Sequence, residues 1–360
     1  MKDEGREGVE RQFRSVFAAA HTVIAEAPGR INLIGEHTDY NGGMVLPTVL
    51  ARSVQVAIGS AGLSEDQIYS TNFDSMTSRR IGGSKTGEWS DYAAGALAKA
   101  RALGLMDGPV NMVISSTLPS GAGVSSSAAL VTAILRAACK TSDVELAPLE
   151  LAKAARAVEN EYIGVPCGIM DQMAVGLAMP NQAIAIDGAT NEYEMITIPD
   201  DFAFVTLHSG IRRELSDGRY KRRFEECQEA RRALDVEHLC LVEEAKREQI
   251  QYLAEPLNAR ARHVVSEHMR TLAACQALKT ANIGWFGELM NESHRSYARD
   301  FQASTPEIDA VVKLARDLGA IGARLTGGGF GGCITALLQP DLAEKWINEI
   351  TARHPDTVLV

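Results

Sequence analysis

The sequence predicts an α/β fold in two domains. Stretches of strand length, rich in apolar and β-branched residues, alternate along the chain with longer stretches of helix length. Two glycine-rich loops follow predicted strands, which is common where α/β proteins bind ligands. The 360 residues are many for one hydrophobic core and enough for two. We place the two domains at residues 1–185 and 186–360.

The first predicted domain contains both kinds of element. Between residues 22 and 35 we expect a strand, a turn and a second strand, with Pro28 and Gly29 as the break. The remaining elements follow from apolar periodicity. They are a helix at 6–20, strands at 44–60, a helix at 88–104, a strand at 108–119, a long apolar helix at 128–140 and a helix at about 145–163.

The second predicted domain begins with short strands and then becomes helical. The segment "GARLTGGGFGGCITALL", residues 322–338, reads as a strand, a glycine loop and a strand. The other predicted elements are strands at 183–188 and 202–210, a helical region from about 217 to 320, and an amphipathic helix at 341–353.

Composition and charge exclude several classes of function. A net charge of −10 argues against a broad nucleic-acid surface, which needs a basic face. The basic cluster "RYKRR", residues 219–223, lies among acidic residues and reads as a solvated helix face. No apolar run approaches the ~20 residues that span a bilayer. We therefore expect no nucleic-acid partner and no membrane association.

Cysteine usage and the N-terminus indicate a compartment. None of the six cysteines forms a CxxC pair, and a chain of this size does not need disulfides for stability. The first residues, "MKDEGREGVERQFRSVF", are charged and show no apolar signal segment. We expect a monomeric protein of the cytoplasm.

The loop "LPSGAGVSSSAAL", residues 118–130, is the strongest chemical signal. Glycines there expose backbone N–H groups, and three serines begin an apolar helix whose N-terminus favours an anion. A serine hydroxyl in such a loop can also coordinate Mg²⁺. The alternative is a helix capped by serine after a tight turn. The loop lacks the G-K-[ST] of a Walker A motif, and it lacks the third glycine of a dinucleotide-binding loop.

Three further motifs contain polar or glycine residues that secondary structure and core packing alone do not require. "GEHTDYNGG", residues 35–43, places Glu36, His37 and Asp39 after an apolar strand, where they suit sugar hydroxyls better than zinc; a surface turn is the alternative. Asp171 lies near a helix start among apolar neighbours and needs a partner or a function. "TGGGFGGC", residues 326–333, is either a tight turn or a place of close backbone approach.

Together these motifs resemble a known family of kinases. "PGRINLIGEHTDYNGGMVLP" resembles the galactokinase signature, and "LPSGAGVSSSAAL" is similar to the phosphate loop of the GHMP kinases. "GVPCGIMDQM" and "TGGGFGGC" resemble two further segments of these enzymes. The resemblance covers residues 22 to 340. It implies a ribosomal-protein-S5-like N-terminal domain that binds sugar and ATP, a ferredoxin-like C-terminal domain and an active site in the cleft between them.

The resemblance also implies roles for individual residues. Asp171 would take the proton of the anomeric hydroxyl, and Arg30 would pair with Asp171 and stabilise the transferring phosphoryl group. Ser127 and Glu159 would hold Mg²⁺. The residues expected at the sugar are Glu36, His37, Thr38, Asp39, Gly168, Asp171 and Tyr220. The residues expected at the phosphates of ATP are Gly121, Ala122, Gly123, Val124, Ser125, Ser126 and Ser127.

The activity implied is ATP-dependent phosphorylation of galactose at C1, with alternatives that stay open. A related sugar could replace galactose, namely N-acetylgalactosamine, galacturonate or L-arabinose; Glu36 would repel the carboxylate of an acid sugar. A non-catalytic sugar sensor could lose Asp171, Arg30 or Ser127, yet all three are present. Galactokinases also carry their arginine pair one position later than Arg222 and Arg223.

Overall fold

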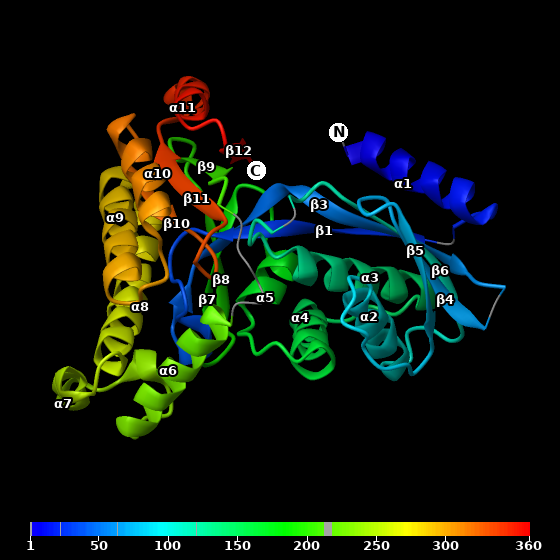
Figure 1. Ribbon diagram of the computed structural model, residues 1–360, viewed down its shortest axis with the longest axis horizontal. Helices are drawn as coiled ribbons and strands as arrows, with labels where there is room; N and C mark the ends of the chain where they lie inside the picture. Colours follow the sequence, from blue (N-terminus) through cyan, green and yellow to red (C-terminus); the bar gives the residue numbers. More distant parts are fainter. Residues whose placement is uncertain (1, 22, 63, 120, 212–217) are drawn as a thin grey trace. The chain divides into compact units, whose positions relative to one another are not determined.

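The computed structural model describes residues 2–21, 23–62, 64–119, 121–211 and 218–360 (Figure 1). The chain divides into two compact units. The first consists of Met1–Gly29, Leu50–Pro119 and Ser125–Leu177, and the second of Arg30–Val49, Ser120–Val124 and Ala178–Val360. The last crossing between the units, before Ala178, lies a few residues ahead of the predicted domain boundary. Two short segments of the N-terminal half also belong to the second unit, and both carry predicted site residues.

A β-sheet forms the centre of the first unit. Strand β3 pairs with β1 and runs antiparallel to β6, which pairs in parallel with β4; β4 and β5 form an antiparallel hairpin. The last residues of β1 and the first residues of β3 belong to the second unit. The bounds are β1 Val23–Asn32, β3 Pro47–Ser60, β4 Glu65–Ser70, β5 Ser75–Arg80 and β6 Val110–Ser116.

Helices cover both faces of this sheet. Helix α1 lies on one face, where Val9 and Phe13 pack against Ile24, Ala57 and Val113 of the strands (Figure 1). The other helices pack on one another on the opposite face, with the apolar α3 in contact with α2, α4 and α5. The bounds are α1 Lys2–Phe17, α2 Asp91–Ala102, α3 Ser126–Ser142, α4 Pro148–Ala157 and α5 Met170–Leu177. A wider, π-helical turn, Val158–Ile163, continues α4.

The second unit contains a four-stranded antiparallel sheet and a smaller group of strands. The sheet has the order β10-β11-β9-β12, and β7 pairs with β2, with β8 and, through Ala183, with Thr48 of β3. The bounds are β2 Met44–Val45, β7 Gln182–Asp187, β8 Tyr193–Thr197, β9 Ala203–His208, β10 Gly322–Leu325, β11 Cys333–Leu338 and β12 Val358–Leu359.

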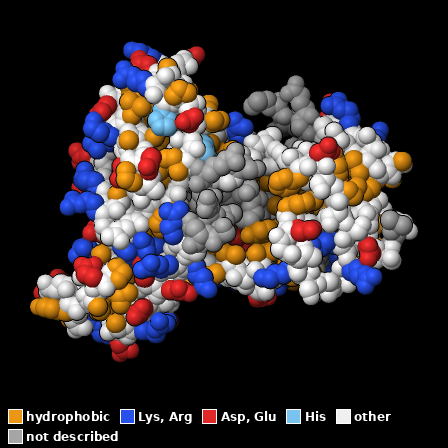
Figure 2. All heavy atoms as spheres, in the orientation of Figure 1, with side chains coloured by type: hydrophobic (Ala, Val, Ile, Leu, Met, Phe, Trp, Pro, Cys, Tyr) orange, Lys and Arg blue, Asp and Glu red, His pale blue; other side chains and the backbone are white. Residues whose placement is uncertain are grey.

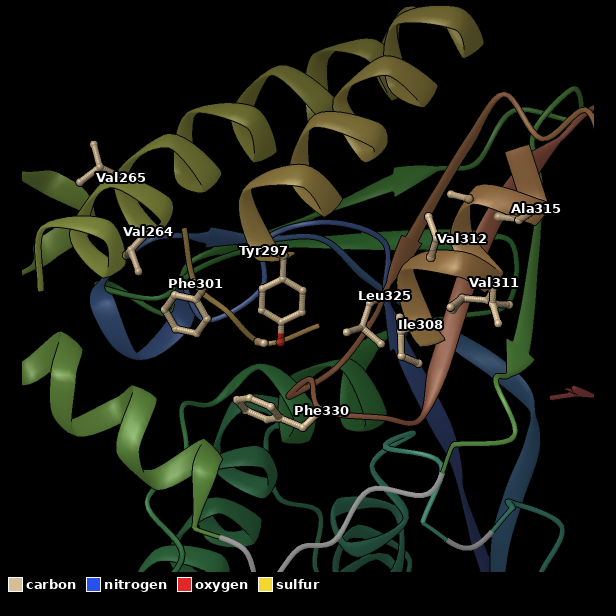
Figure 3. Packing of buried hydrophobic residues seen from close by; sticks show 14 of the residues in the cluster. Val264, Val265, Tyr297, Phe301, Ile308, Val311, Val312, Ala315, Leu325 and Phe330 are labelled. Carbon is tan, nitrogen blue, oxygen red and sulfur yellow. The ribbon is translucent and has the colours of Figure 1, made fainter. Parts of the chain in front are cut away.

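Long helices pack on the strands of the second unit. Helices α8 and α9 form a hairpin, and α9 and α10 contact β10. Figure 3 shows the buried side chains of this region, with the hydroxyl of Tyr297 pointing toward the segment that carries Phe330. The bounds are α6 Arg219–Ala233, α7 Glu244–Arg247, α8 Leu257–Lys279, α9 Ile283–Arg299, α10 Pro306–Asp317 and α11 Pro340–Arg353.

Most predicted elements are present, with two differences. The predicted break at Pro28 and Gly29 is wrong, because β1 continues through both residues. A proline fits an extended strand where the ladder does not need its missing N–H. Strands β4, β5, β8 and β12 were not predicted. The β4–β5 hairpin is polar, "EDQIYS" and "SMTSRR", so it lacks the apolar alternation that identifies a strand.

The basic cluster of α6 is not simply a solvated face. Arg222 is exposed, but Arg223 is buried, pairs with Glu226 and donates to the carbonyl oxygen of Phe301 at 2.7 Å. Arg219 lies over the ring of Phe330, 4.5 Å from its centroid. Burial of Arg223 is possible because these partners satisfy its guanidinium group.

The surface carries both signs of charge. On the face that Figure 2 shows, Lys and Arg side chains are interspersed with Asp and Glu side chains. Within the described part of the chain, none of the helices combines the length and the apolar character needed to cross a bilayer.

Candidate active site

The motif that follows β1 is buried at its centre. Glu36 is 2% exposed and His37 is 5% exposed, although both are polar. Gly35, with φ +102°, makes the turn, and a Cβ there would lie 2.7 Å from the carbonyl oxygen of Met44. Only glycine fits this position, so the sequence "GEHTD" folds inward directly after the strand.

The carboxylate of Glu36 is held through one oxygen. Oε1 accepts hydrogen bonds from Arg324 Nη1 at 3.0 Å and from the backbone N–H of Gly327 at 2.9 Å. Thr326 Oγ1 lies 3.2 Å from the same oxygen and donates its one hydrogen over the shorter distance, 2.8 Å, to the carbonyl oxygen of Asn32. Among the described residues, the donors recorded for this carboxylate all bond to Oε1. The orientation of the group is therefore fixed, and Oε2 is the oxygen that remains for a ligand.

His37 connects the sugar motif to the third glycine motif. Tyr297 donates its hydroxyl hydrogen to the carbonyl oxygen of Gly327 at 2.8 Å, so its oxygen must accept from His37 Nε2 at 3.0 Å. His37 Nδ1 then accepts from the hydroxyl of Tyr40 at 2.7 Å. Both ring nitrogens thus bond to tyrosines, and the rings of Phe301 and Tyr297 lie against the imidazole.

The remaining predicted sugar residues of the second unit surround His37. The hydroxyl of Thr38 lies 2.8 Å from the carbonyl oxygen of Gly35 and 2.7 Å from that of Met44, so it supports the turn. Asp39 is half-buried at the start of a short 3₁₀ turn. The ring of Tyr220, in the first turn of α6, lies 5.2 Å from the imidazole of His37.

In the second unit, the phosphate loop packs against the third glycine motif. Arg30 donates from Nη1 to the carbonyl oxygen of Gly123 at 2.8 Å, and its backbone N–H bonds to Val124. A Cβ at Gly332 would lie 2.9 Å from the carbonyl oxygen of Ala122. The glycines of "TGGGFGGC" therefore permit close backbone approach, which was one of the two predicted interpretations of this motif. Gly121 is exposed, and Ser120 lies outside the described residues.

In the first unit, the N-terminus of α3 has no side-chain cap from Ser125. Ser125 adopts a left-handed conformation, φ +59°, and donates its hydroxyl hydrogen to Oδ2 of Asp171 at 2.5 Å. The predicted alternative, a serine-capped helix, is therefore not the observed arrangement. Ser126 is exposed at the first position of the helix, where backbone N–H groups favour an anion.

Asp171 lies in the first turn of α5, as predicted, and is half-buried. The buried backbone of Gly168 precedes the helix. The first unit thus places Asp171 and Ser125, which are 46 residues apart in the sequence, within hydrogen-bond distance.

The predicted magnesium ligands also meet in the first unit. Ser127 Oγ lies 3.4 Å from Glu159 Oε1, and the amide of Gln172 donates to the same oxygen at 3.1 Å. Glu159 is buried and sits on the π-helical turn, a feature common at functional sites. Oε1 of Gln172 is buried and has no hydrogen-bond partner among the described residues. A hydroxyl, a carboxylate and a nearby amide oxygen form a donor set that fits Mg²⁺.

Four residues of these clusters were not predicted as site residues. Arg324, Glu267 and His263 contact the sugar motif in the second unit, and Gln172 contacts Glu159 in the first. Arg324 is a charged residue within the first predicted strand of residues 322–338, which was the available signal for it; Glu267 lies in a helix with several other charged residues, so the sequence contains no comparable signal for it. Burial raises the pKa of the Glu267 carboxyl, but Arg270 and Arg324 outweigh it, and the pKa falls to about 2.

Three family models match the chain. The model described as the galactokinase galactose-binding signature matches residues 11–60. The GHMP kinase N-terminal domain matches residues 91–178, and the GHMP kinase C-terminal domain matches residues 274–356. The matched segments include Glu36 and Arg324 of the second unit, and Ser127 and Asp171 of the first unit.

Full-length relatives agree with these matches. A galactokinase of Roseiflexus sp. (strain RS-1) is 36% identical over 373 residues, covering 99% of this chain and 93% of that protein. The crystal structure of Lactococcus lactis galactokinase complexed with galactose superposes with a TM-score of 0.90 at 30% identity, covering 99% and 97% of the two chains. Methanococcus jannaschii mevalonate kinase, at 19% identity, shares the fold with a TM-score of 0.70 over 95% and 98%. The chain belongs to the galactokinase family of GHMP kinases.

Proposed function

We propose that the protein transfers the γ-phosphoryl group of ATP to the C1 hydroxyl of galactose, giving galactose 1-phosphate and ADP. The observation that carries the proposal is the buried Glu36 carboxylate, which lies in the galactose-binding signature with Oε1 held by Arg324 and by the backbone N–H of Gly327. A carboxylate fixed in this way can read the position of one sugar hydroxyl. Such discrimination needs a polar group that is left unpaired by the wrong sugar.

Asp171 acts as the base of the reaction in this proposal. Its carboxylate accepts the proton of the C1 hydroxyl, and the sugar oxygen attacks the γ-phosphorus in line with the departing ADP. The loose transition state of phosphoryl transfer demands little prior activation of the nucleophile, so the proton can leave late. The Ser125 hydroxyl, 2.5 Å from Oδ2, orients the carboxylate.

Arg30 and the phosphate loop stabilise the transferring group. Arg30 already holds the loop through the carbonyl oxygen of Gly123, and its guanidinium charge offsets the charge that builds on the phosphoryl oxygens. The predicted pairing of Arg30 with Asp171 is part of this proposal. Residues 121–127 bind the phosphates through backbone N–H groups and the start of α3.

Ser127 and Glu159 would hold Mg²⁺. A bound ion would offset the negative charge of the phosphate groups. Gln172 keeps the Glu159 carboxylate oriented through its hydrogen bond to Oε1.

On the sugar side, Glu36 and Asp39 accept hydrogen bonds from hydroxyl groups, and Tyr220 and Gly168 line the position of the ring. His37 and Thr38 bond within the protein, so we assign them the role of shaping this loop.

We also propose that the protein works as a monomer in the cytoplasm. Four buried cysteines, Cys227, Cys240, Cys275 and Cys333, are thiols, which suits a reducing compartment. Light scattering of the purified protein tests the monomer.

A substrate panel tests the proposed reaction. ADP release from ATP is measured with galactose, talose, glucose, galactosamine, N-acetylgalactosamine, galacturonate and L-arabinose. Galactose should give the highest kcat/KM, and glucose a value lower by about 10² or more, because a buried polar group loses its partner. Comparable values for glucose and galactose would overturn the assignment. A best value with another sugar of the panel would redirect it to that sugar.

A further inference from the structure

Arg324 is a completely buried arginine at the edge of the sugar motif. It lies in β10 with 0% exposure and directs Nη1 to Oε1 of Glu36 at 3.0 Å. The same Nη1 lies 3.3 Å and 3.4 Å from the carbonyl oxygens of Asn32 and Leu33, where β1 ends. A guanidinium group without water is costly unless charge and hydrogen bonds compensate it. Arg324 finds this compensation on the segment that leads into the sugar motif.

Glu267 is the second buried charge of the cluster. It lies in α8 with 0% exposure, and its Oε1 accepts from the backbone N–H of Gly35 at 3.0 Å and from Ser293 Oγ at 2.6 Å. Oε2 bonds to Arg270 Nε at 2.9 Å. A carboxylate from a distant helix therefore holds the backbone just before Glu36.

Ser293 joins the two charged groups. Its hydroxyl donates to Glu267 Oε1 and accepts from Arg324 Nε at 3.1 Å. Nη2 of Arg324 lies 3.8 Å from Glu267 Oε1, and within the described part of the chain it has no hydrogen-bond partner. An ion pair that served stability alone would be expected to satisfy the whole guanidinium group. The shortest bond from Arg324 to a carboxylate goes instead to Glu36.

Glu36 is consequently fixed at three of its own atoms. Its side chain is held by Arg324, its amide N–H lies 3.4 Å from Glu267 Oε1, and its carbonyl oxygen accepts from His263 Nε2 at 3.3 Å. Backbone and carboxylate cannot move independently, because each has a buried partner. Such fixation removes the entropy that a free glutamate side chain would lose on binding a ligand.

We propose that Arg324 and Glu267, bridged by Ser293, form a positioning unit that sets the galactose affinity of Glu36. Arg324 occupies Oε1 of Glu36 and turns Oε2 toward the sugar, while Glu267 fixes the backbone turn at Gly35. Neither residue touches the sugar; both act through Glu36. This inference rests on the proposed function.

The test uses two substitutions of graded size. Ser293→Ala removes only the bridging hydroxyl, and Arg324→Lys keeps the charge but loses the second guanidinium arm. We expect Ser293→Ala to raise the galactose Kd, measured by calorimetry, about tenfold, and Arg324→Lys to raise it more, as expected for bonds to charged groups. The KM for ATP should stay within about twofold, and kcat should fall less than galactose affinity.

A matched control separates positioning from stability. Arg79 and Asp91 form a buried pair in the first unit, with Arg79 Nη2 2.7 Å from Asp91 Oδ1. Arg79→Lys should lower the melting temperature as a buried arginine substitution does, and leave the galactose Kd unchanged. If Arg324→Lys does not fold, Ser293→Ala carries the test alone.

A double-mutant cycle identifies the residue through which the unit acts. In a Glu36→Gln background, Ser293→Ala should change the galactose Kd by less than about twofold, because the carboxylate that it positions is gone. Independent, multiplicative effects of the two substitutions would overturn the proposal. So would an unchanged galactose Kd in folded Ser293→Ala. Failure of the wild-type protein to bind galactose would instead reject the proposed function, so the two failures are distinguishable.

Discussion

Two carboxylates of the proposed site, Glu36 and Asp171, differ in how deeply they are buried. Glu36, in the second unit, is 2% exposed, and its Oε1 accepts from Arg324 and from the backbone N–H of Gly327. Asp171, in the first unit, is half-buried, and its Oδ2 accepts from the hydroxyl of Ser125. The first arrangement contains the cation of Arg324, and the second contains the hydroxyl group of Ser125.

The difference follows from what each carboxylate would do. A group that recognises a hydroxyl keeps its charge throughout the reaction, so a buried cation can stabilise it permanently. In the proposed reaction Asp171 gains and loses a proton in every turnover, so its surroundings must accommodate both protonation states. In the proposed function, recognition therefore belongs to Glu36 and proton transfer to Asp171.

The largest effect should come from Asp171→Asn. Asparagine keeps the shape and one acceptor oxygen for Ser125 but cannot accept the proton. We expect kcat to fall by about 10²–10⁴, the usual range for loss of a general base, with the galactose Kd changed only a few-fold. Steady-state kinetics and calorimetry on the same preparation measure both quantities.

Glu36→Gln is the matched substitution in the other unit. It should raise the galactose Kd more than it lowers kcat, the reverse of Asp171→Asn. If folded Asp171→Asn keeps kcat within a few-fold of the wild type, Asp171 is a positioning residue and the division of roles fails.

The second prediction concerns stability in acid. Burial lowers the pKa of His263 to about 4, and the ring bonds to the carbonyl oxygen of Glu36. Between pH 6.5 and 4 the unfolded chain binds a proton that the folded protein does not, so stability present above pH 6.5 is lost as the pH falls. His263 should account for about 3 kcal/mol over this window.

Urea unfolding of the wild type and of His263→Gln, at pH 7.5 and pH 5, measures this contribution. The substitution should flatten the pH dependence of the free energy of unfolding. An equal slope in both proteins would show that His263 is not the group responsible. Glu267, with a pKa of about 2, loses its stabilisation only below its ordinary pKa, so the two contributions separate by pH.

The third prediction concerns the metal in the first unit. Ser127→Ala and Glu159→Ala each remove one proposed Mg²⁺ ligand. Either should raise the Mg²⁺ concentration for half-maximal activity by about tenfold or more, since even indirect contacts to a metal contribute that much. The galactose Kd without nucleotide should not change. Unaltered Mg²⁺ dependence in both variants would contradict the assignment.

Local patterns in the sequence correctly predicted several elements of both units. The serines at the start of α3, the position of Asp171 in the first turn of α5, and the strand, glycine loop and strand of residues 322–338 are all confirmed. Each is visible within a window of about twenty residues, because turn residues and apolar runs are adjacent there.

Long-range partners could not be predicted in the same way. Glu267 lies 232 residues from the backbone N–H that it holds, and Arg324 lies 288 residues from Glu36. In the sequence Arg324 is one charged residue in an otherwise apolar strand, and Glu267 is one of several charged residues in its helix, a pattern that also fits a solvated face. The break predicted at Pro28 is wrong for a related reason. Whether a strand can contain a proline depends on whether its neighbour needs the missing N–H, and the local sequence does not show which strand is the neighbour.

The smallest effect should come from Tyr297→Phe, which tests the histidine link in the second unit. The change removes the hydroxyl that accepts from His37 Nε2 and donates to Gly327, and it leaves a buried N–H without its partner. We expect a loss of about 1–2 kcal/mol in the free energy of unfolding. Tyr69→Phe is the control, because the hydroxyl of Tyr69 bonds to Asp74 in an exposed position of the first unit and should contribute less than about 0.5 kcal/mol. Urea unfolding of both variants measures the difference.

Galactose affinity should fall a few-fold in Tyr297→Phe alone, because the imidazole that shapes the sugar loop loses one of its two tyrosine hydroxyls. Equal losses of stability in the two variants would mean that the second unit holds its recognition loop no more firmly than an exposed hairpin.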